Sequence, residues 1–318
     1  MLYLTESNVV ELLDMPSAVA AVESAFLAKA HGQIVNRPRL RVPLRRGTYN
    51  ILAAGWTTGG MVGHKSYLAR LGGVPRPFHI QLYDADDGGA LAILEAWTLS
   101  NIRTGAVSGL SARYMATIGG EVAIIGSGLQ ARTQLEAVVL ATRASAARVY
   151  SRTAERRNQF ADLMSKQLDI DVRPADSPEA CIEGAQTVVT ITTAVEPVLK
   201  REWFAPGVHV IAAGNNNWMK SEIDVEAIED FDVVAVDDVE QAKIECGELM
   251  RAAEIGYFTW DQAVPLSEIV AGRRAGRSSA ADKTLFESQG IGLEDIAVAG
   301  LVYQRAVQAG VGIQLPSG

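Results

Sequence analysis

Short apolar runs that stop at glycine or polar residues alternate with segments of helical spacing from residue 121 onward. The first run, Glu121-Val122-Ala123-Ile124-Ile125, is rich in β-branched residues and predicts a buried strand. It stops at Gly126, and residues 132–142 then carry apolar side chains at helical spacing without a breaker. This pattern predicts a strand, a tight turn and a helix, in that order.

The alternation continues to residue 236 and predicts a doubly wound parallel sheet of the Rossmann type, in the α/β class. The further elements are expected at 147–151, 154–168, 171–174, 177–184, 187–192, 207–213 and 231–236. Each is short enough for a strand or a crossover helix.

The first part of the chain follows a different pattern, typical of a mainly antiparallel α+β domain. Strands are expected at 2–4, 39–42, 48–54, 63–68, 78–83 and 90–95, and helices after a cap near Thr5 or Ser7, from Pro16 to Gly32, and at 100–118. A last helix at 296–309 is expected to return to this part. We therefore expect a first domain at 1–118 plus 296–318 and a dinucleotide-binding domain at 119–295.

The glycine turn has the residues that a pyrophosphate requires. Gly126 permits a sharp reversal, Gly128 lets the backbone approach a phosphate, and Ala131 is small enough for close packing of helix on sheet. The first N–H groups of the helix would then face the anion. The residues expected to contact the cofactor are Gly126, Ser127, Gly128, Leu129, Gln130 and Ala131. The alternative is a turn that contains glycine for steric reasons alone.

The end of the next strand bears on the choice of cofactor. An NAD site usually places an Asp or Glu here for the ribose, whereas this chain has Ser151, Arg152 and Thr153. A cation with two hydroxyls suits a 2′-phosphate, so NADP(H) is favoured and NAD(H) is the alternative. Arg152 could instead begin a solvated basic helix.

Composition excludes several classes of function. The chain has 318 residues, 48% of them hydrophobic, and a net charge of −8, which argues against binding to nucleic acid or a lipid surface. No apolar run approaches the roughly 20 residues of a membrane helix and no export leader is recognised, so a cytoplasmic location is expected. The 2 cysteines and 4 histidines show no metal spacing, and no metal is predicted. Five arginines between residues 37 and 46 are the exception, a local cluster that fits a small anionic substrate.

The whole chain resembles the ornithine cyclodeaminase and mu-crystallin family. The resemblance is carried by the glycine turn some 120 residues into the chain and by several short motifs: Arg39-Leu40-Arg41, Gly63-His64-Lys65, Asn101 to Ala106, Val236-Asp237-Asp238, Cys246 to Leu249 and Gly290 to Asp295. It implies a nicotinamide cofactor and a small amino or imino acid as substrate. It also implies that the first domain, 1–118 plus 296–318, binds the substrate and joins two copies into a homodimer through its sheet.

The resemblance also implies roles for several residues. Arg41 and Arg103 would hold a substrate carboxylate as planar bidentate cations, with Arg39 as a helper. Lys65 would contact the substrate and assist proton transfer. The alternatives are a surface position for Arg39, a helix-packing ion pair for Arg103 and an exposed edge-strand position for Lys65.

Three further residues are expected to border the nicotinamide. Thr192 and Thr193 end a strand at the same sheet edge as the glycine turn, and Leu293 lies in the turn before the last helix. Leu293 could equally belong to the core. Asp295 is expected to cap that last helix.

Asn216 decides between two reactions of the family. Cyclodeaminases carry an aspartate in this loop, and an amide cannot act as a base near neutral pH. We therefore predict an NAD(P)H-dependent reductase of α-imino acids, of the ketimine, Δ1-pyrroline-2-carboxylate or Δ1-piperideine-2-carboxylate type, that forms an L-amino acid. The alternatives are an ornithine-type cyclodeaminase with bound NAD, an amino acid dehydrogenase similar to alanine dehydrogenase, and a non-catalytic NADPH-dependent ligand-binding protein.

Overall fold

The computed structural model describes residues 1–69 and 78–316. The chain divides into two compact units, of which the first comprises Met1–Arg103 with Ile291–Gly318 and the second Thr104–Gly290. The sequence placed these boundaries later, after residues 118 and 295. They fall earlier because helix α3 (Trp97–Met115) begins in one unit and continues into the other.

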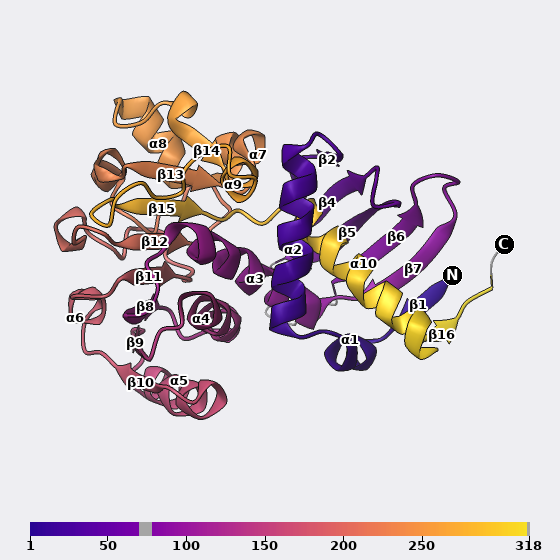
Figure 1. The fold of residues 1–318 in the computed structure, drawn as a ribbon, viewed down its shortest axis with the longest axis horizontal. Coiled ribbons are helices and arrows are strands. Elements are labelled where there is room, and N and C mark those ends of the chain that lie inside the picture. Colours follow the sequence, from indigo (N-terminus) through magenta and orange to yellow (C-terminus); the bar gives the residue numbers. More distant parts are fainter. Residues whose placement is uncertain (70–77, 317–318) are drawn as a thin grey trace. The chain divides into compact units, whose positions relative to one another are not determined.

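A mainly antiparallel sheet forms the first unit (Figure 1). Its strands run in the order β16-β1-β7-β6-β5-β4-β2, and β3 pairs with β4. Only β1 and β7 are parallel among the described pairs. The strands are β1 (Leu2–Leu4), β2 (Ile34–Asn36), β3 (Leu40–Leu44), β4 (Gly47–Trp56), β5 (Met61–Ala69), β6 (His79–Asp84), β7 (Ala90–Glu95) and β16 (Ile313–Gln314).

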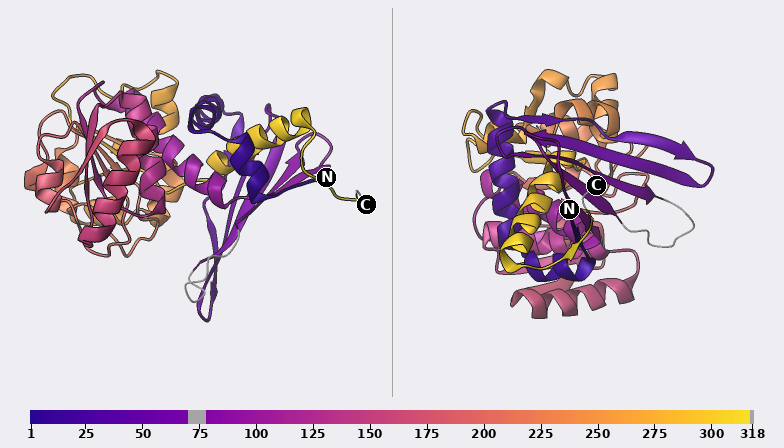
Figure 2. Two further views of the ribbon diagram at one scale, coloured as in Figure 1. Left: turned by 90° about the horizontal axis from the view of Figure 1, so that it is seen from below. Right: turned by 90° about the vertical axis from the view of Figure 1, so that its right-hand side faces the viewer.

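Helices cover one face of this sheet. Helix α10 (Gly292–Ala309) packs on β4, β5 and β6, and α2 (Met15–Ala30) packs on α10, with α1 (Glu6–Leu12) beside it (Figure 2). Gly63 permits the close approach of α10, because a β-carbon there would lie 2.9 Å from Cδ1 of Ile296 and 2.2 Å from the Gln81 carbonyl oxygen. Gly63 and Lys65, on the face of β5 toward α10, are therefore buried.

The second unit contains the predicted Rossmann-type sheet. Its strands are all parallel and run in the order β10-β9-β8-β11-β12-β15-β13-β14. The chain order reverses between β8 and β11, which is the point where such sheets bind dinucleotides. The strands are β8 (Glu121–Ile125), β9 (Ala146–Tyr150), β10 (Asp171–Pro174), β11 (Thr187–Thr190), β12 (His209–Ala212), β13 (Val233–Val236), β14 (Ala263–Pro265) and β15 (Thr284–Glu287).

Crossover helices connect these strands. They are α4 (Leu129–Thr142), α5 (Ala154–Leu168), α6 (Pro178–Ile182), α7 (Val239–Glu245), α8 (Gly247–Ile255) and α9 (Leu266–Val270), with short 3-10 turns η1 (Arg201–Trp203), η2 (Val225–Asp230) and η3 (Trp260–Gln262). The predicted fold class is confirmed. Among the described residues, no helix is long and apolar enough to span a bilayer.

Candidate functional site

The glycine turn connects β8 to α4 as predicted. Gly126 has φ of +125°, and a β-carbon there would lie 2.4 Å from the Ile191 carbonyl oxygen, so only glycine fits. Gly128 is the N-cap of α4, provides no side-chain cap, and would hold a β-carbon in open space. The helix begins at Leu129, three residues before the predicted start, so its first N–H groups lie within the turn itself.

The residues predicted to bind the ribose 2′-phosphate lie next to this turn. Ser127 Oγ donates to Ser151 Oγ at 2.8 Å, which ties the turn to the end of β9. Arg152 and Thr153 follow and are exposed, with Thr153 as the N-cap of α5. Ser151, Arg152 and Thr153, which the sequence predicts to bind the 2′-phosphate, therefore lie on the β9 side of the turn.

Thr192 and Thr193 follow β11 on the other side of the turn. A residue that the sequence analysis missed, Glu222, is buried and accepts hydrogen bonds from both the backbone N–H and the hydroxyl of Thr192. Its only sequence signal was its position ten residues after β12, which does not separate it from any other loop carboxylate.

The asparagine loop lies beside these threonines. Asn215 Nδ2 donates to the Ala194 carbonyl oxygen at 3.3 Å, and Lys220 Nζ reaches the Thr193 carbonyl oxygen at the same distance. Asn216 lies between Asn215 and Asn217 and is half-buried. The loop after β12 and the loop after β11 thus form one edge of the second sheet.

A second site lies within the first unit, where Lys65 and Arg103 are held by two carboxylates. Lys65 Nζ lies 2.8 Å from Asp295 Oδ1, and Arg103 Nε lies 2.9 Å from the same oxygen. Arg103 Nη1 also lies 2.6 Å from Glu294 Oε2. All four side chains are buried, and both carboxylates lie in the first turn of α10, where the helix dipole favours negative charge. We call these four residues the ion-pair cluster.

Aromatic residues and a third cation complete this environment. Arg39 is buried and its Nη1 donates to the Tyr67 hydroxyl at 2.5 Å. The Lys65 ammonium lies 5.7 Å from the Tyr67 ring centroid and 5.9 Å from that of Phe78. Three basic side chains, Lys65, Arg103 and Arg39, are therefore buried close to two aromatic rings.

Burial, together with the nearby charges of Arg103 and Arg39 and against the opposing effect of Asp295, lowers the pKa of Lys65 to about 7. A lysine with this pKa exchanges its proton near neutral pH, which an ordinary surface lysine does not do. It can therefore donate a proton to the nitrogen of a bound substrate near neutral pH.

The structure changes the predicted roles of two residues near this cluster. Arg41 lies on the exposed strand β3 with its Nη1 3.5 Å from Asn50 Oδ1, whereas Arg39, expected only as a helper, is the buried arginine. Asp295 was predicted to cap α10, which is wrong, because Ile291 is the N-cap and the Asp295 carboxylate pairs with Lys65 and Arg103. Leu293 is fully buried and its N–H donates to Asn36 Oδ1.

The fold also brings Glu287 next to two residues that lie about 40 positions earlier in the chain. Cys246, Glu248 and Glu287 are buried in the second unit, and their ligand-type atoms lie within 4.8 Å of one another. Burial raises the pKa of Glu248 to about 7 and that of the Cys246 thiol well above its usual value. The sequence analysis noted Cys246 to Leu249 as a motif but did not connect it with Glu287, because no short spacing links the two.

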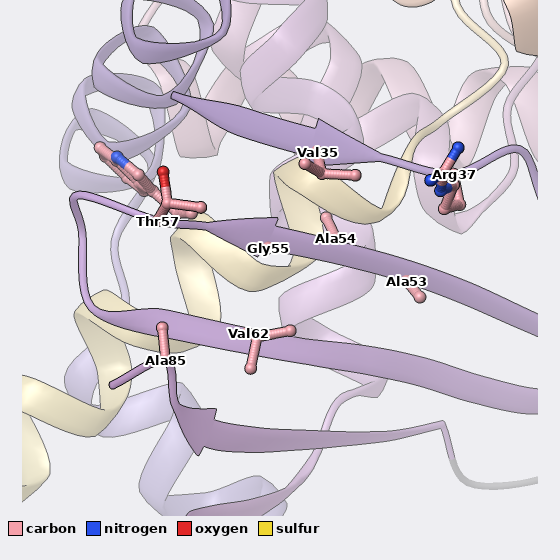
Figure 3. A pocket seen from close by; sticks show the side chains of 9 residues that line it. Val35, Arg37, Ala53, Ala54, Gly55, Thr57, Val62 and Ala85 are labelled. Atoms are coloured by element: carbon pink, nitrogen blue, oxygen red, sulfur yellow. The ribbon is translucent and has the colours of Figure 1, made fainter. Parts of the chain in front are cut away.

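A shallow hollow of about 400 Å³ lies on the face of the first sheet opposite α10 (Figure 3). Val35, Gly55 and Val62 are neighbours across β2, β4 and β5 and line it, together with Ala53. Side chains alternate along a strand, so Val62 points away from the face on which Gly63 meets α10. The hollow is thus separate from the ion-pair cluster.

The chain is similar to known proteins over almost its whole length. Residues 1–310 match the model of the ornithine cyclodeaminase/mu-crystallin family, so the chain belongs to that family. It is 31% identical over 322 residues to alanine dehydrogenase of Archaeoglobus fulgidus, covering 99% of this chain and 98% of that protein.

Two solved structures are also similar. Δ1-pyrroline-2-carboxylate reductase of Thermococcus litoralis, in complex with NADH and L-proline, superimposes with a TM-score of 0.94 at 30% identity and covers 99% of this chain and all of that one. An archaeal alanine dehydrogenase dimer with bound NAD has a TM-score of 0.92 at 30% identity, with 99% of both chains covered. The predicted class, an NAD(P)-dependent oxidoreductase acting on CH–NH or C=N groups, is confirmed.

The two glycines of the turn should respond differently to substitution. Gly126→Ala should lower the free energy of unfolding by about 1–3 kcal/mol, because its β-carbon meets the Ile191 carbonyl and its φ is positive. Gly128→Ala should fold with nearly unchanged stability and bind NADH or NADPH more weakly. Urea denaturation and fluorescence titration measure the two effects. Equal stability of both variants would contradict this account.

The Lys65 ammonium should titrate near pH 7 in the free protein. In protein labelled with ¹³C at lysine Cε, one NMR signal, absent from Lys65→Met, should shift around that pH. Asp295→Asn removes the carboxylate that favours the charged form, so it should move the midpoint to lower pH. Titration of every lysine signal above pH 9 would refute this assignment.

Proposed function

We propose that this protein is an NAD(P)H-dependent reductase of α-imino acids that forms an L-amino acid, with a five- or six-membered cyclic imine as the substrate class. The ion-pair cluster with Arg39 carries the proposal. It is buried, it brings a guanidinium and an ammonium group to one carboxylate oxygen, and it includes a lysine whose pKa is lowered to about 7. An α-imino acid presents one carboxylate and one basic nitrogen.

Each residue of the cluster has a distinct task in this reaction. Arg103 is held in place by Glu294 and Asp295, so its guanidinium meets the carboxylate in a fixed orientation. Lys65 keeps the imine nitrogen protonated, which makes its carbon electrophilic. When bound, the reduced nicotinamide supplies the hydride for that carbon. Orientation of this kind contributes at most on the order of 7–11 kcal/mol to lowering the barrier.

Asn216 favours reduction over cyclodeamination. The loop after β12 has amides at positions 215, 216 and 217, and none can accept a proton from a substrate amine or water near neutral pH. A cyclodeaminase would release ammonia without net consumption of cofactor. The alanine dehydrogenase relative favours a second candidate, in which the same site acts on a linear amino or imino acid.

We propose NADP(H) as the preferred cofactor, with NAD(H) as the alternative. The end of β9 carries Ser151, Arg152 and Thr153 and no carboxylate, and Ser151 is bonded to Ser127 of the phosphate turn. The two similar structures contain NADH and NAD, so the preference rests on these residues of this chain alone.

The uncovered sheet face of the first unit supports a homodimer. Val35 and Val62 expose 49% and 40% of their surface there, around the hollow of Figure 3. Light scattering on the purified protein should give twice the chain mass of 34.0 kDa, and Val62→Glu should shift the population toward monomer. A monomeric wild-type protein at micromolar concentration would rule this assembly out.

The proposed activity is tested with a panel of cyclic and linear 2-imino acids, each offered with NADPH and with NADH. Absorbance at 340 nm should fall fastest with Δ1-pyrroline-2-carboxylate or Δ1-piperideine-2-carboxylate, and Arg103→Lys should raise KM at least about tenfold, because a bidentate contact is lost. Arg152→Asp should shift the ratio of rates toward NADH. Ammonia release from ornithine without cofactor turnover would overturn the reductase assignment, and cofactor binding without any turnover would favour a binding protein.

A further inference from the structure

The buried carboxylate of Glu222 joins the ends of two neighbouring strands. Its Oε1 accepts from the Thr190 hydroxyl at 2.7 Å, the Thr192 N–H at 2.7 Å and the Thr192 hydroxyl at 2.6 Å. Its Oε2 accepts from the Gly214 N–H at 2.7 Å. Thr190 ends β11 and Gly214 follows β12, so one side chain fixes the carboxyl ends of both strands.

Close packing around Glu222 leaves this arrangement little freedom. A β-carbon on Gly214 would lie 2.4 Å from Glu222 Oε2 and 2.4 Å from the Thr192 nitrogen, which only glycine avoids. The backbone N–H of Glu222 donates to Glu248 Oε1 at 2.6 Å. Glu248 therefore fixes the backbone of Glu222, while the Glu222 carboxylate accepts from Thr190, Thr192 and Gly214.

The position of Glu222 in the sheet relates it to one end of the cofactor. Ser127 and Ser151 join the glycine turn to β9, which places the adenosine ribose on that side of the point where the strand order reverses. The other half of a dinucleotide then lies over the ends of β11 and β12. Those are the two strands that Glu222 joins.

We propose that Glu222 is a positioning residue that shapes the nicotinamide end of the cofactor site through Thr192 and Gly214. This inference rests on the proposed function only in requiring a nicotinamide cofactor at this sheet edge. In this role Glu222 does not contact the cofactor itself. It fixes the backbone of Thr192 and Gly214, and that backbone borders the nicotinamide.

The variant Glu222→Gln tests this role with almost no change of shape. A carboxylate accepts at both oxygens, whereas an amide must present its NH₂ on one side. The hydroxyls of Thr190 and Thr192 can rotate to suit either orientation, but the backbone N–H groups of Thr192 and Gly214 cannot. Either orientation of the amide thus opposes a fixed N–H, and one strand end must move.

The experiment compares two ligands by calorimetric titration. NADH includes the nicotinamide, and ADP-ribose lacks it and occupies the rest of the site. Glu222→Gln should weaken NADH binding about tenfold, the effect expected for one lost hydrogen bond, while the affinity for ADP-ribose stays within about twofold. Asp282→Asn is the matched control, since Asp282 accepts the N–H groups of Ser278 and Ser279 just before β15, at the opposite sheet edge, and should change neither affinity.

Equal weakening of both ligands would show a general structural role and overturn the proposal, as would unchanged affinity for NADH. If Glu222→Gln does not fold, Glu222→Asp keeps the charge but reaches only one strand and should give the same difference between the ligands. Because the assay needs no turnover, it separates the two proposals. A wild-type protein that binds NADH but reduces no imine contradicts the reductase function alone.

Discussion

The structure of the first unit depends on the buried ion pairs that Lys65 and Arg103 form with two carboxylates of α10. Lys65 and Arg103 reach the interior only because Glu294 and Asp295 meet them there. Removing one member of such a group leaves its partner charged and unpaired, which commonly destabilises a protein by about 3–5 kcal/mol. The face of β5 that packs on α10, the glycine that permits this packing, and the acidic first turn of α10 all serve the same arrangement.

The second unit solves a related problem with carboxylates that accept backbone N–H groups. Glu222 joins the ends of β11 and β12, and Asp237 after β13 accepts the N–H groups of Gln289 and Gly290 at 2.8 and 2.7 Å. Loops at the carboxyl ends of parallel strands have N–H groups with no partner in the sheet. Buried acids supply the missing acceptors and so hold the ligand-binding edge of the sheet rigid.

Local patterns predicted the fold well. Apolar runs that end at glycine gave the β8–α4 turn and the parallel sheet, because those signals lie within a few neighbouring residues. Strand β15 was missed, although it is fully buried between β12 and β13, because its four residues Thr-Leu-Phe-Glu carry no periodicity of their own. The start of α4 was predicted three residues late because a glycine N-cap leaves no polar side chain as a signal.

The site was harder to predict where its residues meet only in three dimensions. Lys65 and Arg103 came from motifs, but the partners that tune them come from α10, some 190 to 230 residues further along the chain. The role of Glu222 and the meeting of the Cys246 to Leu249 motif with Glu287 were missed for the same reason. Which of Arg39 and Arg41 is buried depends on where the regular pairing of β3 begins, and the alternating arginines do not specify that position.

Arg152 differs from all of these residues in contributing little to the folded core. It is exposed in the loop after β9, whereas the ion-pair cluster is buried and mutually dependent. Substitutions at exposed positions usually change stability by less than about 0.5 kcal/mol. In the site proposed above, the preference between NADP(H) and NAD(H) can therefore change through single exposed substitutions during evolution, while the buried ion-pair cluster stays fixed.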